Sequence, residues 1–128
     1  MKQLVKVAAV QFNIIVGDID ANLAYVEEAL GRVAAQGCNL AVLPEMWSTG
    51  YSYRNMNELA LRTPEIVEEM RRLSGDYGMV IVGSLPEPHG DKVCNTAYVL
   101  DRGALAGTYR KIHLFSMMGE DRSLHGGD

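Results

Sequence analysis

The chain has 128 residues and a formal net charge of -4, and 48% of its residues are hydrophobic. This length suits one folded domain with a single core. The hydrophobic share, with only 22% charged residues, excludes an intrinsically disordered chain. The mildly acidic balance argues against a nucleic-acid-binding surface, and no apolar run approaches the roughly 18 residues of a membrane span.

The N-terminus and the two cysteines favour a cytoplasmic protein. Residues 1–3 lead directly into a strand-like segment, without the apolar region and cleavage site of a signal peptide. Cys38 and Cys94 have no metal-ligand spacing and do not form the framework of a disulfide-rich domain. The histidines show no ligand spacing with them. We therefore expect a protein of the reducing cytoplasm that binds neither a metal nor a membrane.

The first third of the chain has the pattern of a strand, a helix and a second strand. Residues 4–12 are mostly apolar on both faces, which is typical of a central strand covered on two sides. Asp20 is a suitable N-cap for an amphipathic helix that Gly37 ends. Residues 40–43 form a second short buried strand. Together they predict a βαβ unit with two parallel strands.

Two helices follow a loop of aromatic residues at 47–53. A short helix is expected at residues 57–62. Thr63 then starts a longer helix as its N-cap, because a proline and an acid occupy the first turn. The apolar residues of this helix recur at helical spacing as far as Leu73, and a glycine at 75 or 78 closes it.

The remaining pattern predicts strands separated by turns. Residues 79–83 are a short apolar run and predict a third buried strand. Residues 85–92 contain two prolines and a glycine and are expected to form a surface loop. Residues 96–100 and 104–109 flank a tight Asp-Arg-Gly turn, which is typical of a β-hairpin.

The C-terminal segment suggests an incomplete domain. Residues 116–128 show no periodic pattern. Strands that are apolar on both faces need helices on both sides, yet the sequence offers only two good helices. We therefore expect a core that this chain only half builds.

Two charged residues that follow strands are candidates for chemistry. Glu45 comes directly after the strand at 40–43, at the carboxyl end where ligands collect in open α/β sheets. Partial burial there would raise its pKa and suit it to a general base; an ordinary loop acid is an equally good interpretation. Lys111 ends the last strand. Most such lysines are solvated, but one held beside a buried glutamate would stabilise an oxyanion.

The other candidates carry less information by themselves. Strand alternation places His113 on the same face as Lys111, but a lone histidine more often has a structural role. Glu120 alone has the character of a loop acid, and Cys38 and Cys94 are expected to be buried and structural. The sequence contains no phosphate-binding glycine loop, dinucleotide fingerprint or serine-hydrolase elbow.

Taken together, these segments resemble the carbon-nitrogen hydrolase (nitrilase) superfamily along the whole chain. The similar segments, in chain order, are the first strand at 7–12, the start of the first helix at 17–23, the general-base motif at 43–51, a strand at 94–99 and the lysine motif at 109–115. The stretch 117–120 resembles members close to the omega-amidases. The resemblance makes Glu45 the general base, Lys111 the catalytic lysine and Glu120 a second, supporting glutamate.

The resemblance also implies a fold and a reaction. The fold is an α/β architecture, half of an α-β-β-α sandwich, and two such sandwiches usually meet in a homo-oligomer. The reaction is hydrolysis of a small amide or nitrile through a thioester, without a cofactor. Trp47 and Tyr51 are candidate substrate-binding residues, although aromatic loop residues pack on a core equally often. A 2-oxo acid monoamide would need a cation for its carboxylate; Arg54, Arg122 and a residue outside the chain all remain open.

The nucleophile departs from the family pattern. In the family a cysteine beyond the lysine attacks the substrate, and neither Cys38 nor Cys94 lies in such a motif. We therefore expect residues 1–128 to be the N-terminal part of one hydrolase domain, inactive alone, with Glu45 and Lys111 converging at one sheet edge. The alternatives are a truncated homologue that acts as a binding or assembly module and, less well matched, an unrelated small α/β domain.

Overall fold

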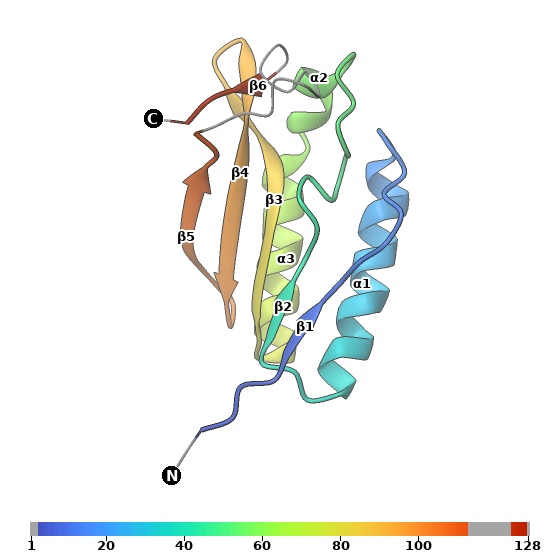
Figure 1. Ribbon diagram of the computed structural model, residues 1–128, viewed down its shortest axis with the longest axis vertical. Coiled ribbons are helices and arrows are strands. Elements are labelled where there is room, and N and C mark those ends of the chain that lie inside the picture. Colours follow the sequence, from blue (N-terminus) through green and yellow to red (C-terminus); the bar gives the residue numbers. More distant parts are fainter. Residues whose placement is uncertain (1–2, 113–123, 128) are drawn as a thin grey trace.

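The computed structural model describes residues 3–112 and 124–127, which form a mixed sheet with helices packed on one face (Figure 1). The strand order is β1-β2-β3-β4-β5, and β6 pairs with β4 beyond the end of β5. The elements are β1 (Val7–Ala9), α1 (Ile19–Ala35), β2 (Leu40–Val42), α2 (Met56–Ala60), α3 (Thr63–Tyr77), β3 (Val80–His89), β4 (Lys92–Asp101), β5 (Ala104–Arg110) and β6 (Leu124–His125).

The predicted βαβ unit is confirmed, but its first strand is not central. β1, β2 and β3 are parallel, with Ala8 opposite Ala41 and Ala41 opposite Ile81. In the described part of the chain β1 pairs only with β2, so it forms an edge, and Val7 remains 55% exposed. The prediction of a strand buried on two sides was wrong because the helices cover only one face of this sheet.

The β3–β4 hairpin is longer than the sequence predicts. Residues 85–92, expected as a surface loop, continue both strands to a turn at Gly90. Pro86 lies opposite Asn95, whose carbonyl accepts a hydrogen bond from the Lys111 N–H on the other side of β4. The Pro86–Asn95 pair is therefore a non-hydrogen-bonded one, where a proline removes no ladder bond. The loop prediction was wrong because proline breaks a strand only where its nitrogen faces the partner.

The helix starts also differ from the predicted ones. The N-cap of α1 is Asp18, whose Oδ1 accepts a hydrogen bond from Ala21 N at 3.1 Å, rather than Asp20. Thr63 is the first residue of α3, not its cap, because its hydroxyl donates to the carbonyl of Pro86 at 2.6 Å.

None of the described helices has the combination of length and hydrophobicity that a membrane crossing requires.

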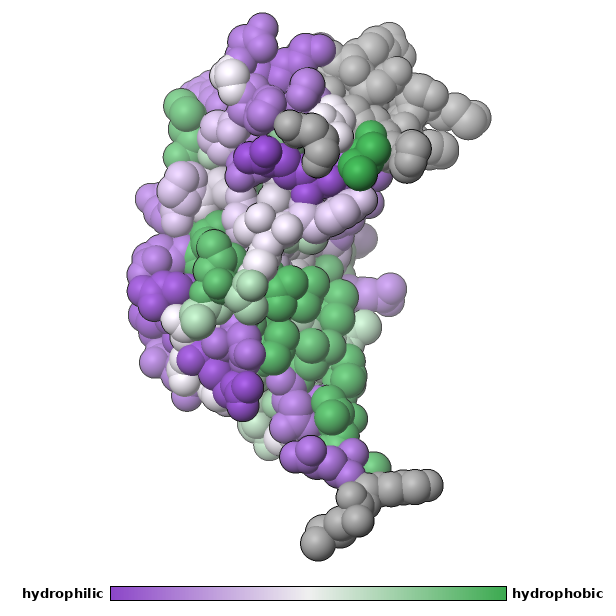
Figure 2. All heavy atoms as spheres, turned by 90° about the vertical axis from the view of Figure 1, so that its left-hand side faces the viewer, coloured by the Kyte–Doolittle hydropathy of each residue, from purple (hydrophilic) through white to green (hydrophobic). Residues whose placement is uncertain are grey.

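The two faces of the sheet differ in their cover. Ile81 and Leu85 of β3 are fully buried beneath α3, whereas the alternating Val80 and Val82 are partly exposed on the opposite side. Strand register places a set of apolar residues on that opposite side, which we call the open face: Val7, Val42, Val80, Val82, Ala97, Val99 and Tyr109. Figure 2 shows hydrophobic side chains gathered on this hollowed side of the molecule. The expected half-built core is therefore observed in the described residues, which place helices over one face only.

Candidate active site

Glu45 and Lys111 meet at one end of the open face. Glu45 follows β2 and Lys111 follows β5, and the Lys111 Nζ atom lies 3.0 Å from Glu45 Oε1. The side chains are 50% and 32% exposed, respectively, so solvent or a small molecule has access to both. The predicted convergence of these two residues is confirmed, because strands β2 and β5 end at the same edge of the sheet.

The chain turns sharply directly after Glu45. Met46 has a φ of 52°, a left-handed conformation that residues with a side chain rarely adopt. Its N–H donates to Ser84 Oγ at 2.8 Å, and its carbonyl accepts from the Gly50 N–H at 2.8 Å. The Met46 side chain is fully buried, so both packing and hydrogen bonds hold this turn in place. Glu45 therefore projects from a fixed backbone.

Asn95 joins the parts of the site from the neighbouring strand β4. The side chain of Asn95 is almost fully buried, and its Nδ2 atom lies 2.6 Å from Glu45 Oε1 and 3.2 Å from the hydroxyl oxygen of Tyr51. Its backbone carbonyl accepts from Lys111 N at 2.8 Å. The sequence pattern did not single out this residue. The available signal was a polar side chain whose alternation places it on the same face as Ala97 and Ser84.

The environment of Glu45 lowers its pKa below the ordinary value. Partial burial acts to raise the pKa, but hydrogen bonds from Tyr51, Lys111 and Asn95 and the charge of Lys111 outweigh that effect. The expectation of a pKa raised by burial was therefore wrong, because the donors around the carboxylate stabilise its charged form. A carboxylate that stays ionised is competent to accept a proton at neutral pH.

A cleft of about 320 Å³ opens in front of the pair. Its wall is formed by the open face, the segment that follows β2 and the first half of β3. It is lined by Leu43, Glu45, Val82, Gly83, Ser84, Asn95, Ala97, Tyr109 and Lys111. One end of the cleft carries a carboxylate, an ammonium group and an amide, and the rest is mostly apolar. This arrangement suits a small uncharged polar group bound beside Glu45 and Lys111.

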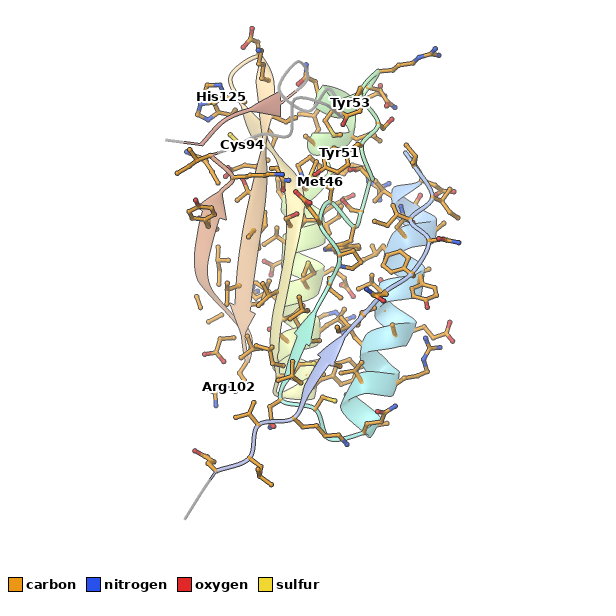
Figure 3. All side chains as sticks on the ribbon, viewed as in Figure 1. Met46, Tyr51, Tyr53, Cys94, Arg102 and His125 are labelled. Atoms are coloured by element: carbon orange, nitrogen blue, oxygen red, sulfur yellow. The ribbon has the colours of Figure 1, made fainter. Side chains whose placement is uncertain are left out.

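The two aromatic candidates have different positions. Tyr51 belongs to the site, since its hydroxyl accepts a hydrogen bond from Asn95 and bonds to Glu45. Trp47 is fully buried in the core, against Gly83, where a Cβ atom would lie only 3.0 Å from the indole ring. The prediction that Trp47 binds substrate was therefore wrong. Figure 3 shows Tyr51 at the end of the sheet opposite to Arg102.

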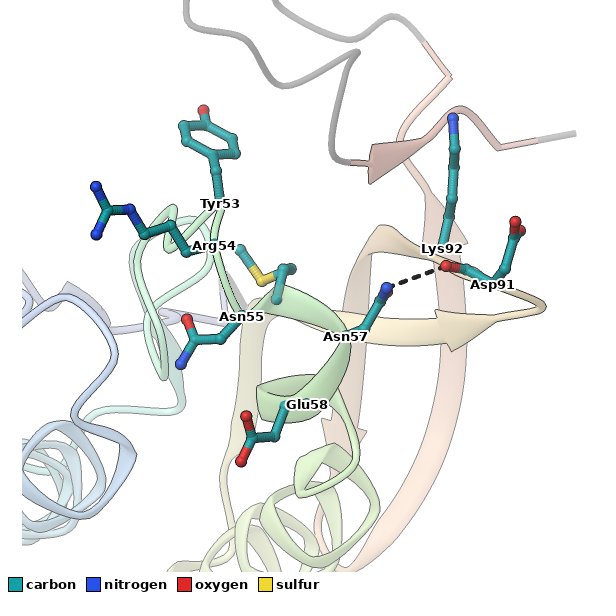
Figure 4. Close-up of a pocket in the computed structure, with 8 residues that line it drawn as sticks. Tyr53, Arg54, Asn55, Asn57, Glu58, Asp91 and Lys92 are labelled. Atoms are coloured by element: carbon teal, nitrogen blue, oxygen red, sulfur yellow. Dashed lines mark hydrogen bonds between the residues drawn. The ribbon is translucent and has the colours of Figure 1, made fainter.

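Arg54 lines a different pocket, of about 470 Å³, beside α2 and the β3–β4 turn. Figure 4 shows Arg54 and Lys92 on opposite sides of this pocket, and Asn57 Nδ2 donates to the carbonyl of Asp91 at 3.1 Å. Arg54 is not among the residues that line the Glu45 cleft. The remaining candidates, His113, Glu120 and Arg122, lie outside the described residues.

Neither cysteine faces the Glu45 carboxylate. Cys38 precedes β2 and Glu45 follows it, so the two residues lie at opposite ends of this strand. Cys94 is fully buried and pairs in register with Glu87, on the helix-covered side of β4. Both cysteines are buried and no disulfide joins them, as expected. Within the described part of the chain, no group of three or more His, Cys, Asp or Glu residues is arranged to hold a metal ion.

Comparison with known proteins identifies the family of the chain. Residues 6–125 match the carbon-nitrogen hydrolase family. The chain is 36% identical over 117 residues to a nitrilase of Pyrococcus abyssi, covering 88% of this chain and 45% of that protein. It is 30% identical over 124 residues to the 2-oxoglutaramate amidase of Bacillus subtilis, covering 94% of this chain and 48% of the relative. The chain thus spans about half the length of these curated relatives.

A solved structure shows the same fold. It is an amidase from Nesterenkonia sp. AN1, of the nitrilase superfamily, in complex with butyramide. It superposes with a TM-score of 0.87 at 26% sequence identity, covering 97% of this chain and 49% of the amidase. The family match spans nearly all of the chain, including the segments that carry Glu45 and Lys111. The chain therefore belongs to the carbon-nitrogen hydrolase family.

Proposed function

We propose that this chain supplies the base and the oxyanion-stabilising lysine of a cysteine-dependent amidase. The observation that carries the proposal is the Glu45–Lys111 pair, with 3.0 Å between Nζ and Oε1, at the mouth of a cleft on the open face. The lowered pKa keeps the Glu45 carboxylate ionised, and therefore able to accept a proton, at neutral pH, and a fixed ammonium group beside it stabilises a developing negative charge.

The two residues have separate roles in the proposed reaction. Glu45 takes the proton of a cysteine thiol as the sulfur attacks the amide carbon, and Lys111 stabilises the negative oxygen of the tetrahedral intermediate. The C–N bond then breaks, the leaving amine takes the proton from Glu45, and a thioester remains. Glu45 next accepts a proton from water, whose oxygen attacks the thioester. The C–S bond then breaks, the acid is released, and the sulfur takes the proton back from Glu45, which restores the thiol and the ionised carboxylate. Glu120 is proposed to support this exchange.

The nucleophilic cysteine comes, in this proposal, from outside the 128 residues. Cys38 and Cys94 are both buried, and neither faces Glu45 across the cleft. A variant of the Nesterenkonia amidase carries acrylamide added to its active-site cysteine, which supports a thiol nucleophile in this fold. A thiolate needs an adjacent base, and Glu45 is placed to serve a sulfur that approaches from the open side of the cleft.

The proposed substrate is a small amide, and among these a monoamide that carries a carboxylate. The cleft of about 320 Å³ has room for a small molecule beside Glu45, and one relative is a 2-oxoglutaramate amidase. The amidase with butyramide supports a short aliphatic chain beside the amide group. We further propose a cytoplasmic homo-oligomer, because the two cysteines are unbridged and the open face is apolar.

The proposal is tested by comparing the 128-residue chain with a polypeptide that extends it through the family's cysteine segment. Ammonia release from butyramide and from 2-oxoglutaramate is measured for both. We expect turnover only by the extended protein, and its loss on Glu45→Gln or Lys111→Met. Turnover by the 128-residue chain that disappears on Cys38→Ser or Cys94→Ser would overturn the proposal. A folded extended protein that binds amides without turnover would favour a non-catalytic binding module.

A further inference from the structure

We propose that Asn95 is the positioning residue of the site, holding the Glu45 carboxylate and the Lys111 backbone in one fixed arrangement through a single side chain and its carbonyl. This inference deepens the proposed amidase function and rests on it for its catalytic meaning. Asn95 lies on β4, which is located between β2 and β5 in the sheet. Glu45 follows β2 and Lys111 follows β5, and Asn95 contacts both residues.

The geometry makes Asn95 a junction of three segments. Its Nδ2 atom donates to Glu45 Oε1 at 2.6 Å, which fixes the loop after β2. The same nitrogen donates to the hydroxyl oxygen of Tyr51 at 3.2 Å, and Tyr51 in turn bonds to Glu45. The carbonyl of Asn95 accepts from Lys111 N at 2.8 Å, which fixes the backbone that carries the lysine. Since Asn95 is only 2% exposed, water does not readily replace these contacts.

The amide and the lysine hold the same oxygen of the Glu45 carboxylate. Oε1 receives both Asn95 Nδ2 at 2.6 Å and Lys111 Nζ at 3.0 Å. A carboxylate oxygen has two lone pairs, so it can accept both hydrogen bonds at once. Together the two donors fix the carboxylate relative to Lys111, and removing the amide donor leaves one of these two contacts.

No other residue type of similar size serves here. An aspartate would place a second carboxylate about 2.6 Å from the first and make one of them hold a proton. A leucine has similar bulk but donates no hydrogen bond, so it leaves the carboxylate with fewer donors in a partly buried place. A serine retains one donor on a shorter side chain. These three substitutions separate the effects of volume, charge and hydrogen bonding.

The first test measures the carboxyl pKa of Glu45 by 13C NMR in the 128-residue chain and its variants. Asn95→Leu should raise this pKa toward or above the ordinary value, and Asn95→Asp should raise it further. The matched control is Thr96→Val, because the neighbouring Thr96 faces the opposite side of β4 and bonds to Glu87. Thr96→Val should leave the Glu45 pKa unchanged. If the folded Asn95→Asp chain shows the same Glu45 pKa as the parent, the inference is wrong.

The second test uses amide turnover by the extended protein. Misplacing a catalytic group by about 1 Å costs about 10²-fold in rate, so Asn95→Leu should lower kcat by about that factor with KM nearly unchanged. Asn95→Ser should recover part of the lost kcat. If Asn95 had only a structural role, Asn95→Leu and Asn95→Ser would lower kcat equally. If Asn95→Leu does not fold, the near-isosteric Asn95→Asp replaces it. An unchanged kcat in Asn95→Asp would overturn the inference; a parent protein without turnover, but with the expected pKa shifts, would overturn the amidase proposal instead.

Discussion

Arg110 and Lys111 are consecutive residues that pair with carboxylates on opposite faces of the sheet. Arg110 Nε lies 2.7 Å from Glu87 Oε1 on the helix-covered side, and Lys111 Nζ lies 3.0 Å from Glu45 Oε1 on the open face. Strand alternation at the end of β5 explains the division. The chain is therefore held from both sides where it leaves the sheet, and this limits the movement available to Lys111.

The Glu87–Arg110 pair should contribute stability that depends on pH. Burial acts to raise the pKa of Glu87, but hydrogen bonds from Arg110 and Thr96 outweigh it and the pKa is lowered. A lowered carboxyl pKa stabilises the fold above the unfolded glutamate pKa, and this stability is lost as pH falls through the folded value. Glu87→Gln should lower the free energy of unfolding by about 1 kcal/mol at pH 7, and by less at pH 3.5, in urea denaturation.

The control for this measurement is an exposed ion pair on α1. Glu28 bonds to Arg32 at 2.8 Å, but the two side chains are 71% and 56% exposed. Glu28→Gln should therefore change the free energy of unfolding by no more than about 0.5 kcal/mol. Equal effects of Glu28→Gln and Glu87→Gln would contradict the assigned role of the partly buried pair.

Gly83 should be required for the close packing of Trp47 beneath the site. A Cβ atom at Gly83 would lie 3.0 Å from Leu43 Cβ and from two atoms of the indole ring. Gly83→Ala should therefore lower the free energy of unfolding by about 1–3 kcal/mol, because buried groups must shift. Gly107 on β5 is the matched control, since a Cβ there meets nothing within 4 Å. A denaturation midpoint equally affected by Gly107→Ala would contradict the packing argument.

The sequence predicted the positions of Glu45 and Lys111 because each follows an apolar run of strand type. Such runs identify strands, and the ends of strands fix the sheet edge to which a side chain belongs. Asn95 could not be recognised this way, because its role depends on contacts with segments 50 residues before and 16 residues after it. Trp47 was misplaced for a related reason: only the missing side chain of Gly83, 36 positions away, makes room for it in the core.

The lowered pKa of Glu45 also could not be predicted from the sequence. Burial alone would raise the pKa, and of the groups that lower it the sequence indicated only Lys111. The opposing effect comes from three donors that lie far apart in the chain: Tyr51, Asn95 and Lys111. The error over residues 85–92 has a similar origin, since the direction in which a proline nitrogen faces depends on strand register.

Tyr51 should shift the pH dependence of the proposed reaction. A base with a lowered pKa remains ionised until pH falls through that value, so the acid limb of kcat/KM should lie below the ordinary glutamate pKa. Tyr51→Phe removes one donor to Glu45 and should move this limb to higher pH in the extended protein. Tyr25→Phe, on α1 and stacked on Phe12, is the control and should leave the limb in place. An acid limb unmoved by Tyr51→Phe would argue against Glu45 as the base.

The open face should cause the 128-residue chain to self-associate. Val7, Val42 and Tyr109 are 55%, 39% and 62% exposed on this face, and an apolar surface of this kind favours association. Sedimentation equilibrium should show a dissociation constant that rises at least about tenfold in Val42→Lys, equivalent to about 1.4 kcal/mol. Leu61, 71% exposed at the end of α2, is the control, and Leu61→Lys should have little effect. A parent chain that is monomeric at millimolar concentration would contradict this expectation.

The two cysteines should be inert in the folded 128-residue chain. Cys94 is fully buried and Cys38 is 9% exposed, so a thiol reagent reaches either one only after local or global unfolding. Reaction with a disulfide reagent should be slow in buffer and fast in denaturant. In the extended protein one additional thiol should react rapidly and be protected by butyramide, while Cys38→Ser and Cys94→Ser should leave turnover unchanged. Rapid labelling of Cys94 in the folded 128-residue chain would contradict its assignment to the helix-covered side of β4 and would make it a candidate nucleophile.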